Sequence, residues 1–212
     1  MKPTPLPESK NPSFDSSSGT GETQRILIVA LGNPGQEYAS TRHNLGFMLA
    51  DMFVASTKIP GAWEENKKFH SLICELRTEN RRLLVVKPQT YVNRSGTAIA
   101  ALISFYKLKP EEIIVLHDDL DISLGHIKLR LGGAAGGHHG VESVMQALDT
   151  DQFTRLRMGI GTTKEHNTEQ FVVSNFASNE HSSVKHMLER ALQALQVLIS
   201  QGLTAAQTRF ND

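Results

Sequence analysis

Three uninterrupted apolar runs, at residues 26–31, 83–86 and 113–116, constrain the fold of this chain more than any other feature. Runs without polar alternation are typical of strands covered on both faces, as in parallel sheets flanked by helices. Segments with helical apolar spacing follow the first run at residues 45–53 and the second at 99–106, and Ser95 is placed to cap the second of these helices. This alternation predicts one α/β domain with a mixed, mostly parallel sheet flanked by helices on both faces.

The expected domain spans residues 25–212. Residues 1–24 hold four prolines and many small polar residues, so we expect a disordered tail there. The tail lacks the apolar core of a secretory signal, and no run in the chain is long enough to cross a bilayer. The single cysteine, Cys74, fits a small core residue in a reducing compartment. The expected location is therefore the cytoplasm, away from any membrane.

The segment 31–46 connects the first apolar run to its helix and concentrates polar residues in one short loop. Asn33-Pro34-Gly35 predicts a type II turn, in which glycine supplies the positive φ. His43 falls at the start of the helix, and Asn44 could simply cap it. Taken alone, the segment fits a capped surface loop as well as a site.

Polar residues also follow the other two runs. Asn93 comes after residues 83–86, and Asp118 comes directly after residues 113–116. In open α/β sheets, ligands bind outside the carboxyl ends of the strands. If the three strands are parallel, Asn93 and Asp118 should therefore meet Asn33 and His43 at one edge of the sheet.

Side chains of these types can together catalyse hydrolysis by acid–base chemistry. His43 is the natural general base, and a carboxylate such as Asp118 would orient its ring and stabilise the cation. Asn33, Asn44 and Asn93 offer neutral donors and acceptors that suit a peptide group or an oxyanion. No serine or cysteine is clearly placed as a nucleophile, so we expect water to attack an activated acyl group such as an ester.

Two other groups of residues have the types found in metal sites and in phosphate-binding loops. Metal-ligand residue types occur in a second set, but their spacing matches no familiar metal site, so we expect no metal and no other cofactor. These residues are His117, Asp118, Asp119, Asp121, His138 and His139. The glycine-rich segment 132–140 precedes a helical pattern without matching a nucleotide-binding motif, so we interpret it as a mobile loop that could contact phosphate.

Two segments near the end of the predicted sheet carry basic residues. Lys128 and Arg130 lie two apart in one alternating strand, and Arg155 and Arg157 lie two apart in another. If these strands are neighbours, their basic faces could clamp phosphates, although solvated faces are the commoner meaning of such charges. Because the formal net charge of the chain is zero, a nucleic-acid partner would need such a local basic surface.

In order and spacing, six blocks of this sequence resemble the bacterial-type peptidyl-tRNA hydrolases, from about Ile26 into the carboxyl-terminal helix. The blocks are Gly32-Asn33-Pro34-Gly35 with Tyr38, Thr41-Arg42-His43-Asn44, the segment Lys87 to Gly96, His117-Asp118-Asp119-Leu120-Asp121, Gly136-Gly137-His138, and the segment Arg155 to Gly161. The resemblance implies a monomeric, metal-free α/β enzyme that cleaves the ester between peptide and tRNA. Its partner would be peptidyl-tRNA.

The resemblance also implies residue roles. His43 would be the catalytic base and Asp118 its partner, while Lys128 and Arg157 would form a tRNA phosphate clamp. The residues expected to contact the substrate are Asn33, Tyr38, Asn44, Asn93 and His139.

His139 departs from the family, which usually has asparagine there. Histidine is larger and can carry a charge, so we expect reduced or altered activity at worst. Two alternatives stay open, an RNA-binding relative of the same fold and a small-molecule esterase. Intact His43 and Asp118 favour the hydrolase over the first, and the paired basic strands favour it over the second.

Overall fold

The computed structural model describes residues 24–59, 62–77, 80–161 and 167–211. The predicted disordered tail falls outside these residues, except for Gln24, which begins the first strand one residue before the expected domain. No helix in the described ranges is long and apolar enough to cross a membrane.

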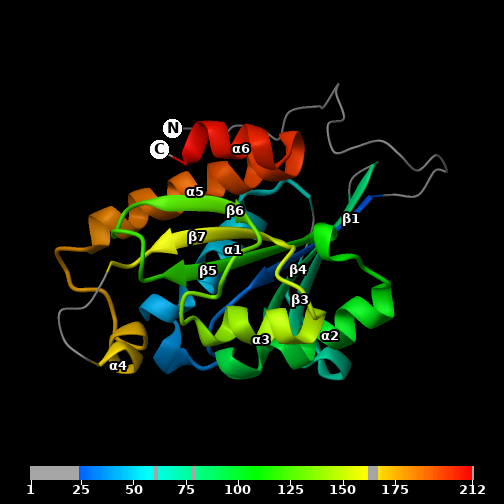
Figure 1. Ribbon diagram of the computed structural model, residues 1–212, viewed down its shortest axis with the longest axis horizontal. Helices are drawn as coiled ribbons and strands as arrows, with labels where there is room; N and C mark the ends of the chain where they lie inside the picture. The colour runs from blue at the N-terminus through cyan, green and yellow to red at the C-terminus, as the bar shows by residue number, and fades with distance from the viewer. Residues whose placement is uncertain (1–23, 60–61, 78–79, 162–166, 212) are drawn as a thin grey trace.

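Seven strands form one mixed sheet in the order β2-β3-β4-β1-β5-β7-β6 (Figure 1). Their bounds are β1 Gln24–Ala30, β2 Glu64–Asn66, β3 Ser71–Arg77, β4 Arg81–Pro88, β5 Ile113–Asp119, β6 Ile127–Leu131 and β7 Thr154–Gly159. The four central strands β4, β1, β5 and β7 are parallel, and the edges formed by β2–β3 and by β6 are antiparallel. The predicted single α/β domain with a mostly parallel, mixed sheet is confirmed.

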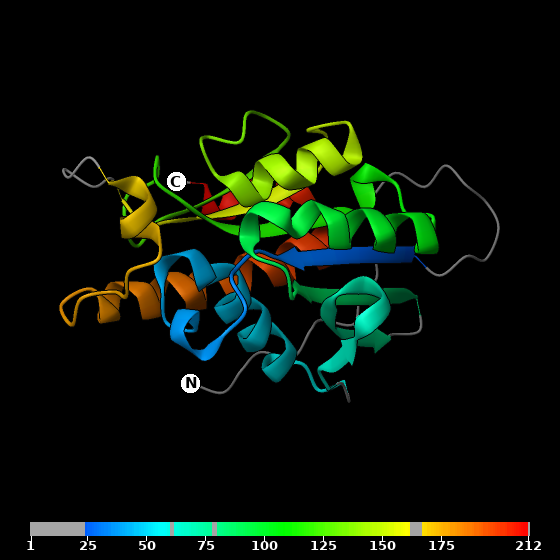
Figure 2. The same cartoon turned by 90° about the horizontal axis from the view of Figure 1, so that it is seen from below.

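Helices cover both faces of this sheet, as the uninterrupted apolar runs require. Their bounds are α1 Leu45–Ser56, α2 Ser95–Tyr106, α3 His139–Leu148, α4 Thr168–Val172, α5 His181–Gln201 and α6 Leu203–Phe210. Alternate residues of β1 point into two separate cores: Ile28 packs with α1, α5 and α6, and Leu27 packs with α2 and α3. Figures 1 and 2 show α2 and α3 together on one side of the sheet.

Two local predictions are wrong. Gly35 has the expected positive φ of 116°, but its ψ of 144° is far from the value near 0° that a type II turn requires. Ser95 does not cap α2, because it is already the first helical residue and its hydroxyl is buried without a partner among the described residues. Both segments make long-range contacts instead: Oδ1 of Asn33 accepts from the N–H of Val92, and the N–H of Gly96, next to Ser95, donates to the Ser143 hydroxyl of α3.

The parallel strands end on the side of the molecule where α4 also lies, at the left of Figure 1. The connection after β1 lies at the same end in Figure 2. The strands β4, β1, β5 and β7, being parallel, therefore bring the residues that follow them to one end of the sheet.

Candidate active site

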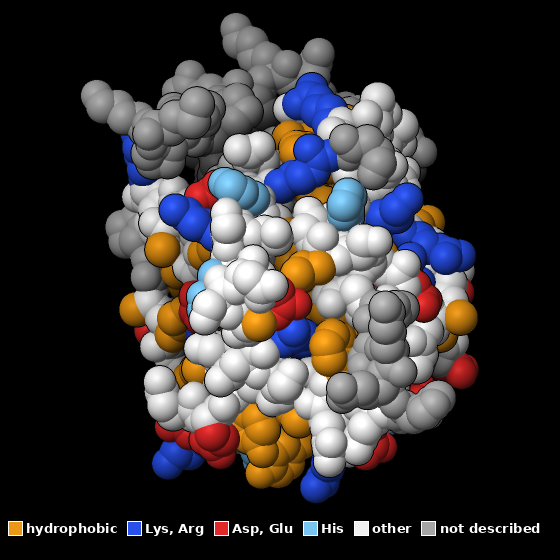
Figure 3. All heavy atoms as spheres, turned by 90° about the vertical axis from the view of Figure 1, so that its left-hand side faces the viewer, with side chains coloured by type: hydrophobic (Ala, Val, Ile, Leu, Met, Phe, Trp, Pro, Cys, Tyr) orange, Lys and Arg blue, Asp and Glu red, His pale blue; other side chains and the backbone are white. Residues whose placement is uncertain are grey.

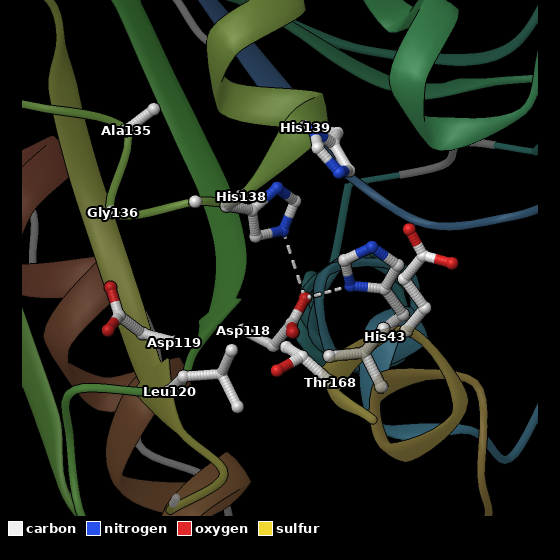
Figure 4. A pocket seen from close by; sticks show the side chains of 12 residues that line it. His43, Asp118, Asp119, Leu120, Ala135, Gly136, His138, His139 and Thr168 are labelled. Atoms are coloured by element: carbon white, nitrogen blue, oxygen red, sulfur yellow. Dashed lines mark hydrogen bonds and ion pairs between the residues drawn. The ribbon is translucent and has the colours of Figure 1, made fainter. Parts of the chain in front are cut away.

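Three side chains from distant parts of the chain meet beyond the end of β5. His43 comes from a short 3-10 helix, η2 (Arg42–Asn44), Asp118 from the end of β5, and His138 from the residue before α3. All three are buried. Figure 4 shows both imidazoles directed at the Asp118 carboxylate.

The contact of His43 with Asp118 is short, with Nδ1 of the imidazole 2.8 Å from Oδ1 of the carboxylate. Burial by itself would raise the pKa of the Asp118 carboxyl, but the two imidazoles outweigh burial and lower that pKa well below its ordinary range. The carboxylate is therefore ionised and can only accept hydrogen bonds. It follows that Nδ1 of His43 carries the proton, and that Nε2 is left with a free lone pair.

His138 is a site residue that the sequence predictions missed. Its Nε2 lies 3.0 Å from the same Oδ1 of Asp118, and its ring centroid lies 4.7 Å from that of His43. The available signal was its place in the Gly136-Gly137-His138 block directly before a helix. A residue at that position is set to cap the helix, as His138 does, and its ring then reaches the strand end.

The backbone fixes which nitrogen of His138 carries the proton. Its Nδ1 accepts hydrogen bonds from the N–H groups of Gly140 at 3.1 Å and Val141 at 3.3 Å, at the start of α3. Since Nδ1 accepts, Nε2 of the neutral ring must be the donor to Asp118.

This tautomer bears on whether the site suits a metal ion. His43, Asp118 and His138 offer ligand atoms within 4.8 Å of one another, a cluster that the sequence spacing did not predict. A metal at Nε2 of His138 would have to displace the proton that the Gly140 and Val141 N–H groups keep on that nitrogen. The donor set therefore fits a hydrogen-bonded triad better than a metal site.

Asn33 and Asn44 join the loops around the triad. Nδ2 of Asn44 donates to the carbonyl of Asn33 at 3.0 Å, and Oδ1 of Asn44 accepts from the N–H of Asn33 at 2.8 Å. The side chain of Asn44 makes no cap bond to α1. Both ends of its amide are thus engaged with Asn33, which favours a positioning role over the predicted direct contact with substrate.

The side chain of Asn33 links two of the predicted clusters. Its Oδ1 accepts from the N–H of Val92 at 2.9 Å, which ties the loop after β1 to the loop after β4. A backbone N–H can only donate, so the orientation of the Asn33 amide is settled. Its Nδ2 makes no hydrogen bond within the described ranges, and this leaves two N–H donors for a ligand.

Asn93 and Tyr38 lie on a neighbouring part of the rim. Asn93 is exposed on the short 3-10 helix η4 (Val92–Arg94), and Tyr38 meets Tyr91 edge to face with ring centroids 6.4 Å apart. None of the predicted substrate contacts Asn33, Tyr38, Asn44 and Asn93 lines the cavity that contains the triad. The Asn33–Val92 bond holds this rim beside the cavity.

The cavity itself lies between the triad, the residues 135–139 and helix α4. His43, Asp118 and His138 form its floor, and Thr168 and Val172 of α4 close another side. His139 lies at its mouth, largely exposed, with Nδ1 3.6 Å from the Glu142 carboxylate. The predicted departure from the family therefore faces the space where a substrate would enter.

Two neighbours of His43 fix where it sits. The guanidinium of Arg42 lies between the rings of Phe171 and Phe176, at 4.5 and 4.7 Å, and pairs with Glu180 at 2.6 Å. On the other side, a Cβ on Gly46 would come within 2.4 Å of the Leu31 carbonyl oxygen. Helix α1 therefore begins directly against the strand ends, and Arg42 ties this turn to the segment that carries α4.

The predicted basic surface forms only in part. Strands β6 and β7 are antiparallel neighbours, with Lys128 opposite Arg157 and Arg130 opposite Arg155. Lys128 and Arg130 are exposed and Arg157 is half-buried, but Arg155 is buried, with its guanidinium bonded to the carbonyls of Gly132 and Ala134. Arg155 thus anchors the glycine-rich loop and leaves the basic surface to the other three residues.

Figure 3 views the molecule from the end where the strands terminate. Lys and Arg side chains gather over the upper half of this face, with histidines between them, and acidic side chains are scattered, mainly over its middle and lower parts. A polyanion approaching this face would thus meet its basic half beside the histidines.

Comparison with known proteins identifies the family. Residues 27–212 match the family model described as peptidyl-tRNA hydrolase. The peptidyl-tRNA hydrolase of Mycobacterium tuberculosis (strain ATCC 25618 / H37Rv) is 42% identical over 187 residues, which cover 88% of this chain and 97% of the relative. That of Mycolicibacterium smegmatis is 43% identical over 183 residues, covering 86% and 95%.

A solved structure agrees over nearly the whole fold. The crystal structure of peptidyl-tRNA hydrolase from Acinetobacter baumannii superposes with a TM-score of 0.82 at 33% identity, covering 90% of this chain and 96% of that one. The predicted family and enzyme class are confirmed. With its Asp118-centred triad and its sheet order in place, the chain belongs to the peptidyl-tRNA hydrolase family.

Proposed function

We propose that this enzyme hydrolyses the ester bond between peptide and tRNA in peptidyl-tRNA, with His43 as the general base that activates water. The observation that carries the proposal is the 2.8 Å hydrogen bond from Nδ1 of His43 to an ionised Asp118. It leaves the unprotonated Nε2 of a cavity-lining ring as the proton acceptor.

The proposed reaction proceeds in two proton-balanced steps. Nε2 of His43 takes a proton as water attacks the ester carbonyl carbon, and Asp118 stabilises the imidazolium that forms. The free Nδ2 donors of Asn33, on the rim of the site, suit the peptide part of the substrate. When the tetrahedral intermediate collapses, the bond to the ribose 3′ oxygen breaks and that oxygen takes the proton from His43. This releases tRNA and the peptide as a carboxylic acid, which then loses its proton to solvent.

The hydroxyl group of Thr168 is an alternative to water as the nucleophile. Its hydroxyl group lines the same cavity, but it makes no hydrogen bond with His43 in the described part of the chain. A hydroxyl that attacks an ester needs a base within hydrogen-bond reach. We therefore expect Thr168→Val to keep turnover within a few-fold of wild type, whereas a covalent threonine mechanism predicts its loss.

Release of free tRNA from a purified peptidyl-tRNA tests the proposal. His43→Ala should lower the turnover number by about 10²- to 10⁴-fold, the usual contribution of a general base. His126→Ala, which removes an exposed histidine next to β6, is the matched control. A wild-type protein that binds tRNA without turnover would overturn the proposed activity, and unchanged turnover in His43→Ala would overturn the assignment of the base.

The proposed enzyme acts as a monomer in the cytoplasm and needs no metal. Turnover that persists after exhaustive chelation would support the metal-free mechanism. Turnover that is lost and restored by added Zn²⁺ would contradict it, and would move the His43–Asp118–His138 cluster to a metal-binding role.

A further inference from the structure

The ion pair between Asp119 and Arg157 lies between the catalytic cavity and the basic surface, and the proposed reaction does not use it. Oδ2 of Asp119 lies 2.6 Å from Nε of Arg157, and the two side chains are only 10% and 16% exposed. Asp119 follows Asp118 directly at the end of β5 and lines the same cavity (Figure 4). The pair therefore connects the two parts of the proposed site.

Arg157 also faces a second cation. It lies directly opposite Lys128 in the antiparallel pair of β7 and β6, so both side chains project from the same face of the sheet. Like charges placed directly opposite each other are destabilising. The Asp119 carboxylate offsets the charge of Arg157 in the free protein, and this reduces the repulsion between the two neighbouring cations.

The way in which Asp119 holds Arg157 leaves the arginine ready for a second anion. Its carboxylate contacts Nε, and neither terminal nitrogen of the guanidinium makes a hydrogen bond within the described ranges. A guanidinium is planar, so a bond at Nε restricts the direction in which the two terminal nitrogens point. Those nitrogens can then bind a phosphate in the bidentate manner that arginine favours.

Asp119 is itself firmly held. Its Oδ1 accepts from the N–H of Asp121 at 2.9 Å, and its carbonyl accepts from the N–H of Ile160 at 3.0 Å. Burial raises the pKa of its carboxyl, but the hydrogen bond from Arg157 and the charges around it lower that pKa overall, so the group is ionised. With both oxygens engaged, the carboxylate cannot rotate without breaking one of these bonds.

We propose that Asp119 is a positioning residue that holds the Arg157 guanidinium so that Arg157 and Lys128 grip one tRNA phosphate at a fixed separation from His43. The proposal rests on the proposed function, which supplies the polynucleotide ester. Because Asp118 and Asp119 are consecutive on one strand, the orienting partner of the base and the holder of the clamp move together. Substrates with a phosphate at the matching distance are thereby selected over short esters.

The alternative role for Asp119 makes the opposite prediction. If it only neutralises Arg157, it competes with the phosphate, and its removal would free a cation and tighten binding of tRNA. If it positions Arg157, its removal weakens binding even though the surface becomes more positive. The sign of the change in KM therefore separates the two roles.

Asp119→Asn and Asp119→Glu should be compared on full-length peptidyl-tRNA and on an N-acyl-aminoacyl-adenosine ester that has no phosphate. For Asp119→Asn we expect KM on the tRNA substrate to rise about tenfold, as expected for loss of one oriented charge-assisted contact. The salt dependence of binding should weaken by about one phosphate contact. The turnover number should change much less. In Asp119→Glu, which keeps a carboxylate, the rise in KM should be smaller than in Asp119→Asn.

Asp121→Asn is the matched control. Asp121 is exposed and lies two residues after Asp119, so the substitution removes the same charge from a nearby side chain. A second test combines Asp119→Asn with Arg157→Ala, and the two effects should be strongly non-additive. The proposal is overturned if KM for tRNA falls, if both substrates respond equally, or if Asp119→Asn has its full effect without Arg157.

These failures differ from failure of the proposed function, which would appear as absence of turnover in the wild-type enzyme. Affinity for uncharged tRNA, measured directly, then still tests the positioning role. Thermal unfolding of each variant shows whether it is folded, and if Asp119→Asn is unfolded, the comparison is carried by Asp119→Glu and Arg157→Ala.

Discussion

Nε2 of His138 lies 3.0 Å from Oδ1 of Asp118, the carboxylate oxygen that also accepts from the proposed base. The same imidazole caps helix α3 through its Nδ1. One side chain therefore links the start of a helix to the end of a strand, and a carboxylate is held by two imidazoles.

His138→Asn and His138→Ala should separate capping from catalysis. Asparagine is a good helix cap, so His138→Asn should stay within about 0.5 kcal/mol of wild type, whereas His138→Ala should lose about 1 kcal/mol of unfolding free energy. Both remove the imidazole that faces Asp118, and both should lower turnover about tenfold or more. Urea unfolding and single-turnover hydrolysis measure the two effects, and full activity in His138→Asn would show that the contact with Asp118 is only structural.

His139→Asn restores the residue that is usual in the family at the mouth of the cavity. The side chain is largely exposed and its contact with Glu142 is long, at 3.6 Å, so unfolding free energy should change by less than about 0.5 kcal/mol. Removing the larger, chargeable ring should raise turnover several-fold. His186→Asn, on the exposed side of α5, is the control, and lower turnover in His139→Asn would show that this enzyme depends on its histidine.

His117 should make the protein less stable in mild acid. Burial, helped by the nearby His138, lowers the pKa of His117 to about 3, against an ordinary value of 6.5. Between these values the unfolded chain binds a proton that the folded chain does not, so unfolding free energy falls as pH falls, by up to about 1.4 kcal/mol per pH unit. His117→Asn keeps a donor for the Asp118 carbonyl and should flatten this slope.

The comparison is best made by chemical denaturation between pH 6.5 and 5.5, where most carboxylates of the unfolded chain are already ionised. The informative quantity is the difference in slope between wild type and His117→Asn, because other histidines contribute equally to both proteins. Parallel slopes would mean that His117 binds protons in the folded state as readily as in the unfolded state.

Gly46→Ala should damage both stability and activity. The new Cβ would lie 2.4 Å from the Leu31 carbonyl oxygen and 2.5 Å from that of Leu116, and backbone atoms at strand ends cannot move aside. We expect a loss of about 1–3 kcal/mol of unfolding free energy, the usual cost of overpacking. Because His43 lies three residues earlier, turnover should fall as well, and wild-type values in thermal unfolding and hydrolysis would contradict this packing.

The fold was largely predictable because its determinants are local and repetitive. Uninterrupted apolar runs required strands buried on both faces, and helical spacing between them required α/β layers. Cys74 is buried, as its place in an alternating segment indicated. Helix α6 was not expected, and it packs through Phe210 against the same core as α5.

For the candidate site, the sequence predicted only that the polar residues after the buried strands would lie close together. His43 and Asp118 were paired from chemistry and topology, and the 2.8 Å contact bears out that pairing, while their catalytic roles stay predictions. The prediction for Arg155 is wrong. Its alternating position predicted an outward basic side chain, but the loop that follows β6 folds over it and uses its guanidinium as an anchor.

The sequence by itself determined the layers of this protein, the ends of its buried strands and the residue types gathered there, because the periodicity of apolar residues is a local property of the chain. Tertiary structure alone decided that His138 shares an oxygen of Asp118, that Asn44 serves the backbone of Asn33, and that Asp119 holds Arg157. The first and third of these contacts join residues from different elements, and the second closes the connection between β1 and α1. Their geometry depends on how the loops pack against the finished sheet, which no local pattern encodes.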